Sequence, residues 1–436
     1  MSINIIGGGL AGCEAAYQVA KRGIKVNLYD MKPNKKSPAH HSDKLCELVC
    51  SNSLKAARKE SAAGMLKEEM RMLDSLLMKC ADKSKVPAGG ALAVDREIFS
   101  NLVNEGINNN PNITVISEEV MEIPDGITII ASGPLTSDLL SDKIKTMFGD
   151  SLSFYDAAAP IVKFDTVDMN KAFFASRYDK GDGDDYINCP MNKEEYDNFY
   201  EALVSAERAP VHDFDVMNPK VYEGCMPIEV MAQRGHDTIR FGPMKPVGLK
   251  DPRTGHRPWA VVQLRKENNA GIMYNLVGFQ TNLKFPEQKR VFSMIPGLEN
   301  AEFVRYGVMH RNTFIDSPRI LNSDYSVREN KNLFFAGQIT GVEGYMESAS
   351  SGLMAGINAA MRYIGEQTVT LPEYTMIGSL SRYISDETVS KFQPMGANLG
   401  VLPELEQRPR DKKERAKAYS DRSFAKLTEF INSRGL

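Results

Sequence analysis

The sequence predicts an α/β fold with a parallel sheet, interrupted by an inserted domain of mixed α and β structure. A glycine-rich turn lies between two strand patterns at the start of the chain, and a second strand pattern ending in glycine occurs near residue 335. Between them the chain changes to short strand-like runs with many turn formers. Since 436 residues exceed one ordinary domain, we expect three parts: residues 1–165, an insertion at 166–300, and the returning part with a tail at 301–436.

The first thirty residues carry the strongest pattern. Residues 2–6 form an apolar strand pattern that leads into Gly-Gly-Gly-Leu-Ala-Gly at 7–12. A helical pattern follows at 13–22, and a second strand pattern at 24–29 ends at Asp30. A glycine-rich turn in this setting, followed by an acid roughly 20 residues on, is typical of a Rossmann-like dinucleotide-binding unit.

Each residue type in this turn has a physical role in binding a dinucleotide. Gly7 permits the tight turn, Gly9 lets the backbone approach a pyrophosphate, and Gly12 lets the helix pack closely on the sheet. Asp30 is placed to accept ribose hydroxyls. A glycine-rich turn that binds nothing is the alternative. The predicted binding residues here are Gly7, Gly8, Gly9, Leu10, Ala11, Gly12 and Asp30.

The stretch from residue 45 to residue 134 alternates between helical and strand-like spacing of apolar residues. A short apolar piece at 45–49 ends in Cys50-Ser51-Asn52-Ser53, which we expect to cap a following helix. Apolar spacing predicts one long helix through 65–77 and another at 96–107, separated by a glycine loop at 86–90. Residues 113–116 and 127–130 read as strands, and the latter exits at Ala131-Ser132-Gly133-Pro134. In flavoproteins with two dinucleotide folds, such an exit lies beside the cofactor.

A nucleotide-binding character returns near residue 332. Residues 332–338 form a buried strand pattern that leaves at a glycine, and a turn at 340–345 precedes a helix of small residues at 348–360. The start of this helix would suit the electron-rich pyrimidine edge of a reduced flavin. A tightly packed core helix is the alternative. The predicted cofactor-binding residues here are Gly337, Gly341, Glu343, Gly344 and Tyr345.

Composition limits the class of protein. No apolar run approaches the length of a membrane helix, and the chain starts directly with a strand pattern, so we expect no membrane contact, no signal peptide and a cytoplasmic location. The six cysteines are scattered, which predicts reduced thiols. The histidines show no metal-ligand spacing, so no metal site is expected.

The charge pattern bears on nucleic-acid binding. Because the net charge is −3, a nucleic acid would have to be met by a local basic patch. The tail from residue 374, expected to be helical, is one candidate, and three basic residues of the insertion are another. An ordinary solvated helix face is the alternative for the tail. The basic residues concerned are Arg408, Arg410, Lys412, Lys413, Arg415, Lys417, Arg177, Lys180 and Lys245.

Three residues could carry chemistry. At a helix N-terminus the thiol of Cys50 would have a lowered pKa and could act as a nucleophile. Cys225 lies between a glycine and a proline-restricted turn inside the insertion. For each cysteine an inert buried thiol is the alternative. His310 could stack on a ring or hold a proton, or it could simply be hydrogen-bonded. Arg311 beside it adds donors that suit a carboxylate.

The chain resembles the folate- and FAD-dependent tRNA (uracil-5-)-methyltransferases, the TrmFO family, nearly from end to end. The glycine-rich opening is one matching segment. Three others are ELVCSNSLKA, YEGCMPIEVMAQRG and LFFAGQITGVEGYMESASSGLMAGINAA. Asp30 stands where a glutamate is more usual in the family, which should still allow ribose binding.

The resemblance implies a specific reaction. The methylene of methylenetetrahydrofolate would pass to C5 of a uridine in the tRNA T loop, at position 54, reduced FAD would make it a methyl group, and NAD(P)H would re-reduce the flavin. The family's two cysteines fall on Cys50 and Cys225. We assign Cys50 as the nucleophile and Cys225 as the partner that handles the proton, and the two roles could be exchanged. His310 and Arg311 would contact the folate.

Two other functions stay open at this point. The same chemistry could act on a uridine of ribosomal RNA. Alternatively, the chain could be a flavoprotein that binds RNA without transferring a methyl group.

Overall fold

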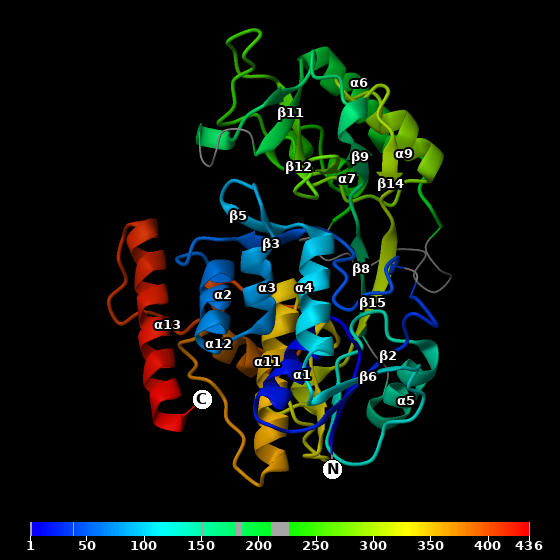
Figure 1. The fold of residues 1–436 in the computed structure, drawn as a ribbon. Helices are drawn as coiled ribbons and strands as arrows, with labels where there is room; N and C mark the ends of the chain where they lie inside the picture. Colours follow the sequence, from blue (N-terminus) through cyan, green and yellow to red (C-terminus); the bar gives the residue numbers. More distant parts are fainter. Residues whose placement is uncertain (1, 38, 150–151, 180–184, 211–225, 436) are drawn as a thin grey trace.

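The computed structural model describes residues 2–37, 39–149, 152–179, 185–210 and 226–435. Its elements form two lobes, one above the other in Figure 1. The large lobe comprises the described residues of 2–148 and 317–435, and the small lobe those of 161–305. Each has its own hydrophobic core. The domain limits expected at residues 165 and 300 stay a prediction.

The large lobe is built on a five-stranded parallel sheet, as the sequence predicts. Strand β1 is central, and Ile3 and Ile5 on it are fully buried. In spatial order the strands are β16 (Leu333–Phe335), β7 (Thr128–Ile130), β1 (Ile3–Ile6), β2 (Val26–Asp30) and β6 (Ile113–Ser117).

Helices cover this sheet, and two of them pack unusually closely. A Cβ atom added at Gly352 of α11 would lie 2.1 Å from the Ala11 carbonyl oxygen of α1, and one at Gly356 would lie 2.7 Å from that of Ala15. The expected close packing of the small-residue helix is therefore confirmed. The large-lobe helices are α1 (Leu10–Lys21), α2 (Ala62–Met72), α3 (Leu76–Lys83), α4 (Arg96–Asn108), α5 (Asp138–Phe148), α10 (Ser317–Ile320), α11 (Tyr345–Tyr363), α12 (Met376–Tyr383) and α13 (Lys412–Arg434).

A small antiparallel sheet lies on the side of the large lobe that faces the small lobe (Figure 1). Its strands, in spatial order, are β3 (Ser53–Ala56), β5 (Ala91–Val94) and β4 (Lys85–Val86).

The small lobe has the mixed α and β structure predicted for the insertion. Its six-stranded sheet packs against helices that contribute Tyr196, Phe199 and Phe292 to the core. The strands, in spatial order, are β10 (Phe173–Phe174), β11 (Tyr186–Met191), β12 (Ala260–Lys266), β13 (Met273–Leu276), β9 (Ile161–Lys163) and β14 (Phe303–Arg305). The helices are α6 (Lys193–Val204), α7 (Ile228–Ala232), α8 (Thr238–Phe241) and α9 (Phe285–Phe292).

An antiparallel ribbon connects the two lobes (Figure 1). It consists of β8 (Leu152–Ala157) and β15 (Met309–Phe314). Short 3-10 turns occur at Phe164–Thr166, Arg177–Asp179, Gln338–Thr340 and Leu399–Val401. Within the described ranges, no helix has the length and apolar character needed to cross a membrane.

Three local predictions are wrong. The long helix expected over 65–77 is two helices, because Asp74 adopts a left-handed φ of 63° and Ser75 caps the start of α3 by accepting from the Met78 amide. The tail is helical only in α12 and α13. Prolines and glycines interrupt 385–411, leaving the 3-10 turn at Leu399–Val401. Finally, no helix follows Cys50 directly: strand β3 begins at Ser53, and α2 starts later with Ser61 as its cap.

Candidate active site

A cavity of about 410 Å³ opens at the carboxyl edge of the parallel sheet. The glycine turn after β1, Asp30 at the end of β2, residues 131–137 after β7 and the start of α11 line it. The carboxyl ends of parallel strands are where open α/β sheets bind their ligands.

The glycine turn is shaped to leave the cavity open. Gly7 has a φ of 108°, and a Cβ atom there would lie 2.4 Å from the Ala131 carbonyl oxygen. At Gly9 an added Cβ would meet nothing within 4 Å, so the backbone is open to a close-lying ligand. Helix α1 begins at Leu10, and the cap residue Gly9 offers no side chain to its N–H groups. A helix start of this kind suits a phosphate.

Asp30 borders the cavity and also holds the turn. Its Oδ2 accepts a hydrogen bond from the Gly8 amide at 2.7 Å, and its Oδ1 accepts from the Lys32 amide at 2.9 Å. A carboxylate has about four acceptor sites, so it can bond to a ribose as well.

A second helix start reaches the same cavity from α11. Gly344 precedes it with a φ of 125°, and a Cβ there would lie 2.2 Å from Oε2 of Glu347. The Gly337 amide donates to Ser351 Oγ at 2.7 Å, which fixes the turn leaving β16 to the same helix. Gln338 donates to Glu343 at 2.5 Å. The turn and the start of α11 therefore form one wall.

Ten of the twelve predicted cofactor-binding residues line this cavity. They are Gly7, Gly8, Gly9, Leu10, Ala11, Asp30, Gly337, Glu343, Gly344 and Tyr345. The other two pack inside the protein. A Cβ at Gly12 would lie 1.8 Å from the Gly7 carbonyl oxygen, and one at Gly341 would lie 2.4 Å from the Phe392 ring.

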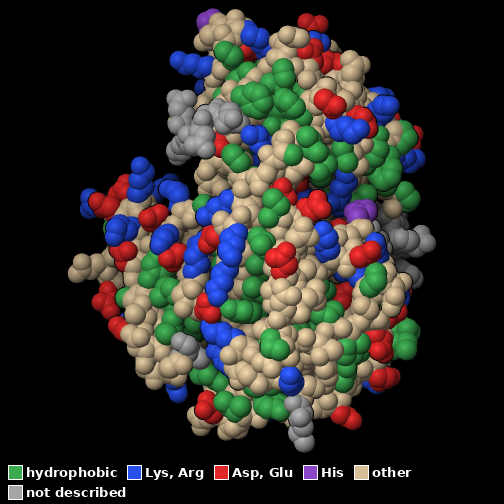
Figure 2. Space-filling model, viewed as in Figure 1, with side chains coloured by type: hydrophobic (Ala, Val, Ile, Leu, Met, Phe, Trp, Pro, Cys, Tyr) green, Lys and Arg blue, Asp and Glu red, His purple; other side chains and the backbone are tan. Residues whose placement is uncertain are grey.

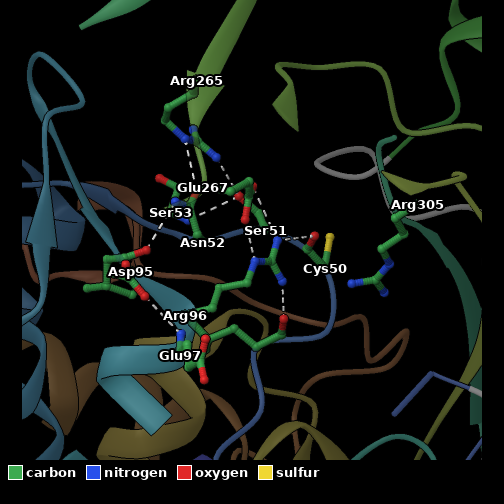
Figure 3. A network of polar contacts seen from close by, with 12 residues as sticks. Cys50, Ser51, Asn52, Ser53, Asp95, Arg96, Glu97, Arg265, Glu267 and Arg305 are labelled. Carbon is green, nitrogen blue, oxygen red and sulfur yellow. Dashed lines mark hydrogen bonds and ion pairs between the residues drawn. The ribbon is translucent and has the colours of Figure 1, made fainter. Parts of the chain in front are cut away.

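Cys50 also lines the cavity, on a loop held by side chains from several elements (Figure 3). The Tyr345 hydroxyl of α11 accepts from the backbone amides of Cys50 and Ser51, at 2.8 and 3.2 Å. The Cys50 Sγ lies 3.8 Å from the Ala157 carbonyl oxygen. Burial raises the pKa of Tyr345 above its ordinary value, so its hydroxyl stays neutral at physiological pH.

Arginine side chains hold the carbonyl groups of this loop. Arg96 at the start of α4 donates to the carbonyl oxygens of Cys50, at 3.0 Å, and of Leu48. Glu267, which is almost fully buried, pairs with Arg96. Arg305 of β14 donates to the Val49 carbonyl at 2.5 Å and extends toward Cys50 (Figure 3).

Arg265 of β12 ties the same loop to the small lobe. It donates to Asn52 Oδ1 at 3.0 Å and to Ser51 Oγ at 2.8 Å. Asn52 in turn donates to the carbonyls of Val94 and Lys266, at 3.1 and 2.9 Å. The loop is therefore clamped between the two lobes.

The surroundings of Cys50 differ from those expected. We expected a helix N-terminus there, but strand β3 follows, and the positive groups that hold this loop are the guanidinium groups of Arg96, Arg265 and Arg305. Sequence reasoning missed these arginines because they come from three distant segments. No local pattern links them to Cys50.

A second cavity, of about 100 Å³, adjoins the first. Three residues line both: Cys50, Ser51 and Gln280. The remaining walls come from β12, from β13 and the residues after it, and from the segment before β9: Arg265, Asn275, Val277, Gly278 and Ala159. Cys50 therefore lies where the large cavity meets the small lobe.

The structure describes the other predicted site residues only in part. Cys225 lies outside the described residues. Met226 is buried, and the Ile228 amide donates to the Gln280 carbonyl at 2.7 Å. His310 and Arg311 lie on β15, opposite β8, and the positions of their side chains are not described. Asn312, two residues on, lines the large cavity.

The predicted basic residues lie in several places. Arg408, Arg410, Lys412, Lys413 and Lys417 are exposed before and along the start of α13, and Arg415 there is half-buried. Lys245 is exposed on the small lobe, Lys180 lies outside the described residues, and Arg177 is half-buried, donating to Gln263 and to the Val247 carbonyl at 2.8 Å each.

Comparisons with known proteins identify one family. The family model described as "Glucose inhibited division protein A" matches residues 2–367. Proteins named methylenetetrahydrofolate–tRNA-(uracil-5-)-methyltransferase TrmFO from Acetivibrio thermocellus and Bacillus pumilus are 61% and 60% identical over 432 residues. These matches cover 99% of this chain and 98% and 99% of theirs.

A solved structure supports the fold. GidA of Aquifex aeolicus in its form II crystal matches with a TM-score of 0.72 at 17% identity, over 99% of this chain and 73% of that one. The parallel-sheet nucleotide fold with an inserted lobe is therefore confirmed, and the chain belongs to the glucose inhibited division protein A family and, within it, to the TrmFO proteins.

Proposed function

We propose that this protein transfers a one-carbon unit from methylenetetrahydrofolate to C5 of a uridine in tRNA and reduces it to a methyl group. The observation that carries the proposal is the position of Cys50, on the wall shared by the glycine-lined cavity and the cavity of the small lobe. Close relatives named for this reaction support it.

The residues of the large cavity fit FAD. Two helix starts without a capping side chain border it, and a side chain at Gly7 would collide with Ala131. Gly8, Gly9, Leu10 and Ala11 would hold the pyrophosphate and Asp30 the ribose, with residues 343–345 against the flavin end. When bound, reduced FAD would supply the electrons that convert the transferred carbon into a methyl group, and NAD(P)H would be the external reductant.

The two cysteines would divide the work on the uracil ring. Uracil C5 is a poor nucleophile until a thiolate adds at C6, and a base must later remove the C5 proton. We assign the addition to Cys50, beside the guanidinium groups, and the proton transfer to Cys225. His310 and Arg311 on β15 would contact the folate.

A fluorinated RNA would test this division. A transcript with 5-fluorouridine at the target position keeps its C5 fluorine, since a base removes only a proton, and the thiol adduct should therefore accumulate. Mass spectrometry should then find the RNA fragment on Cys50. A fragment on Cys225 would exchange the two roles, and no adduct on either cysteine would contradict thiol addition.

The RNA substrate can be tested directly. Purified protein with methylenetetrahydrofolate and NADPH is incubated with a tRNA transcript, with the same transcript carrying cytidine at T-loop position 54, and with ribosomal RNA fragments. We expect 5-methyluridine only in the first. If 5-methyluridine formed on ribosomal RNA alone, the substrate would be ribosomal RNA and not tRNA. If FAD-loaded protein formed no product on any RNA, the protein would be an RNA-binding flavoprotein without methyl transfer.

A further inference from the structure

The second cavity contains groups that the reaction described above does not use. Asn275 of β13 is 3% exposed and lines it, and its amide nitrogen has no hydrogen-bond partner within the described part of the chain. Buried amide groups in native proteins almost always have a partner, so one without a partner beside a cavity points to a bound molecule.

Strand pairing and hydrogen bonds hold the wall around Asn275. Asn275 lies directly opposite Arg265 in the antiparallel pair of β12 and β13, so both side chains are on the same face of the sheet. Arg265 is fixed by its bonds to Ser51 and Asn52. Gln280 also borders the cavity, and its backbone carbonyl accepts a hydrogen bond from the Ile228 amide. Glu229 accepts from Thr281 and from the Asn282 amide, at 2.8 Å each.

We propose that this second cavity receives the target uracil ring and that the carboxamides of Asn275 and Gln280 bind its polar edge. The proposal rests on the proposed function and names the part of the site that selects the base. The volume of about 100 Å³ is several times that needed by one water molecule. The cavity therefore suits a single flat ring but is too small for a whole nucleotide.

The chemistry of uracil determines how the ring would lie. Its C5–C6 edge must face Cys50, whichever step that thiol performs. The opposite edge carries N3–H with a carbonyl on each side, an alternation of donor and acceptors that carboxamides can match. A base can occupy such a cavity only when it is turned out of its stack, as enzymes that modify bases require.

The test uses Asn275→Ala in the full-length, FAD-loaded protein. We expect kcat/KM for a tRNA transcript to fall between about 10- and 100-fold, as for the loss of a paired base contact. The KM for methylenetetrahydrofolate, the flavin absorbance and NADPH oxidation without RNA should stay unchanged. Asn269→Ala is the matched control, because Asn269 is exposed on the β12–β13 hairpin and lines neither cavity.

Gln280→Ala is the second variant, in case Asn275→Ala fails to fold, because Gln280 is only half-buried. Unchanged kcat/KM for tRNA in the folded variants would overturn the proposal. A raised KM for methylenetetrahydrofolate with normal tRNA kinetics would also overturn it, by assigning the cavity to the folate. A wild-type protein that forms no 5-methyluridine would instead refute the proposed function, so the two failures are distinguishable.

Discussion

At the scale of single residues, Cys50 and the charges around it form the centre of the site. The side chain is half-buried and borders both cavities, whereas Cys13, Cys46, Cys80 and Cys189 are buried and free. Burial raises the pKa of Cys80 to about 11 and that of Cys46 well above its ordinary value. Those two thiols therefore stay protonated at neutral pH and are poor nucleophiles.

Replacing Cys50 should separate catalysis from cofactor binding. In Cys50→Ala, and likewise in Cys225→Ala, we expect 5-methyluridine formation to fall below detection while FAD stays bound, since Cys50 is only one part of a large cavity wall. Product analysis and the flavin absorbance at the same protein concentration measure both effects. Cys80→Ala is the control and should keep its activity. Full activity in either of the first two variants would remove that cysteine from the mechanism.

The arginines near Cys50 should control its reactivity. Arg305→Gln removes a positive charge that extends toward the thiol, so alkylation of Cys50 by iodoacetamide at pH 7 should slow by about three- to tenfold. Peptide mass spectrometry measures the rate at Cys50 itself. Arg319→Gln, at an exposed residue of α10, should leave the rate unchanged. An equal rate in Arg305→Gln and wild type would show that the thiolate is stabilised by something else.

At the scale of elements, a buried carboxyl group connects three helices. Glu69 of α2 accepts from the Met376 and Ile377 amides at the start of α12, at 2.7 and 2.9 Å, and from Ser423 Oγ of α13 at 2.6 Å. Burial is the largest influence and raises the pKa of Glu69 to about 7. Packing of the C-terminal helices is therefore coupled to pH.

This coupling predicts a pH-dependent stability. The pKa of Glu69 is higher in the folded than in the unfolded protein. Its contribution to the free energy of unfolding is therefore fully present below about pH 4.5 and is lost as the pH rises through about 7. The loss amounts to at most about 3 kcal/mol. Between pH 5 and pH 8 we expect Glu69→Gln to show a flatter dependence of unfolding free energy than wild type. Glu68→Gln, on the same helix, should keep the wild-type slope. An equal pH dependence of the unfolding free energy in all three proteins would contradict the raised pKa of Glu69.

The elements also show how far sequence reasoning reaches. The strand–glycine turn–helix at the start and the small-residue helix α11 were predictable because local spacing determines them. The irregular segment before α13 and the break at Asp74 were missed, because backbone conformation at one residue overrides periodicity there. The clamp around Cys50 was not predictable, since Arg96, Arg265 and Arg305 meet only after the two lobes form.

At the scale of the whole molecule, the two lobes enclose the site while positive charge lies at its margin. Lys and Arg side chains, with Asp and Glu among them, lie over the start of α13, beside the notch between the lobes (Figure 2). The second cavity takes its walls from both lobes, so we expect an RNA that reaches Cys50 through it to pass between them. The overall charge of −3 makes this local distribution decisive.

A salt titration tests the basic start of α13. If Lys412 and Lys413, both exposed, contact phosphates, log Kd for tRNA should rise linearly with log salt concentration. The double variant Lys412→Glu, Lys413→Glu should then lower that slope by about two, since two phosphate contacts are lost. Arg434→Glu, at the opposite end of α13, should leave the slope unchanged. Fluorescence anisotropy with labelled tRNA provides the measurement. A salt-independent Kd would exclude phosphate contacts as the main source of affinity.

The most direct test of the whole account is a tracer experiment. Purified protein is mixed with NADPH, a tRNA transcript and methylenetetrahydrofolate carrying carbon-14 in its methylene group, and the digested RNA is separated into nucleosides. Wild-type protein should place the label in 5-methyluridine, and FAD-loaded Cys50→Ala should place none there. Label in 5-methyluridine from both proteins, or from neither while FAD is bound, would contradict the claim that the flavin cavity and Cys50 form one active site.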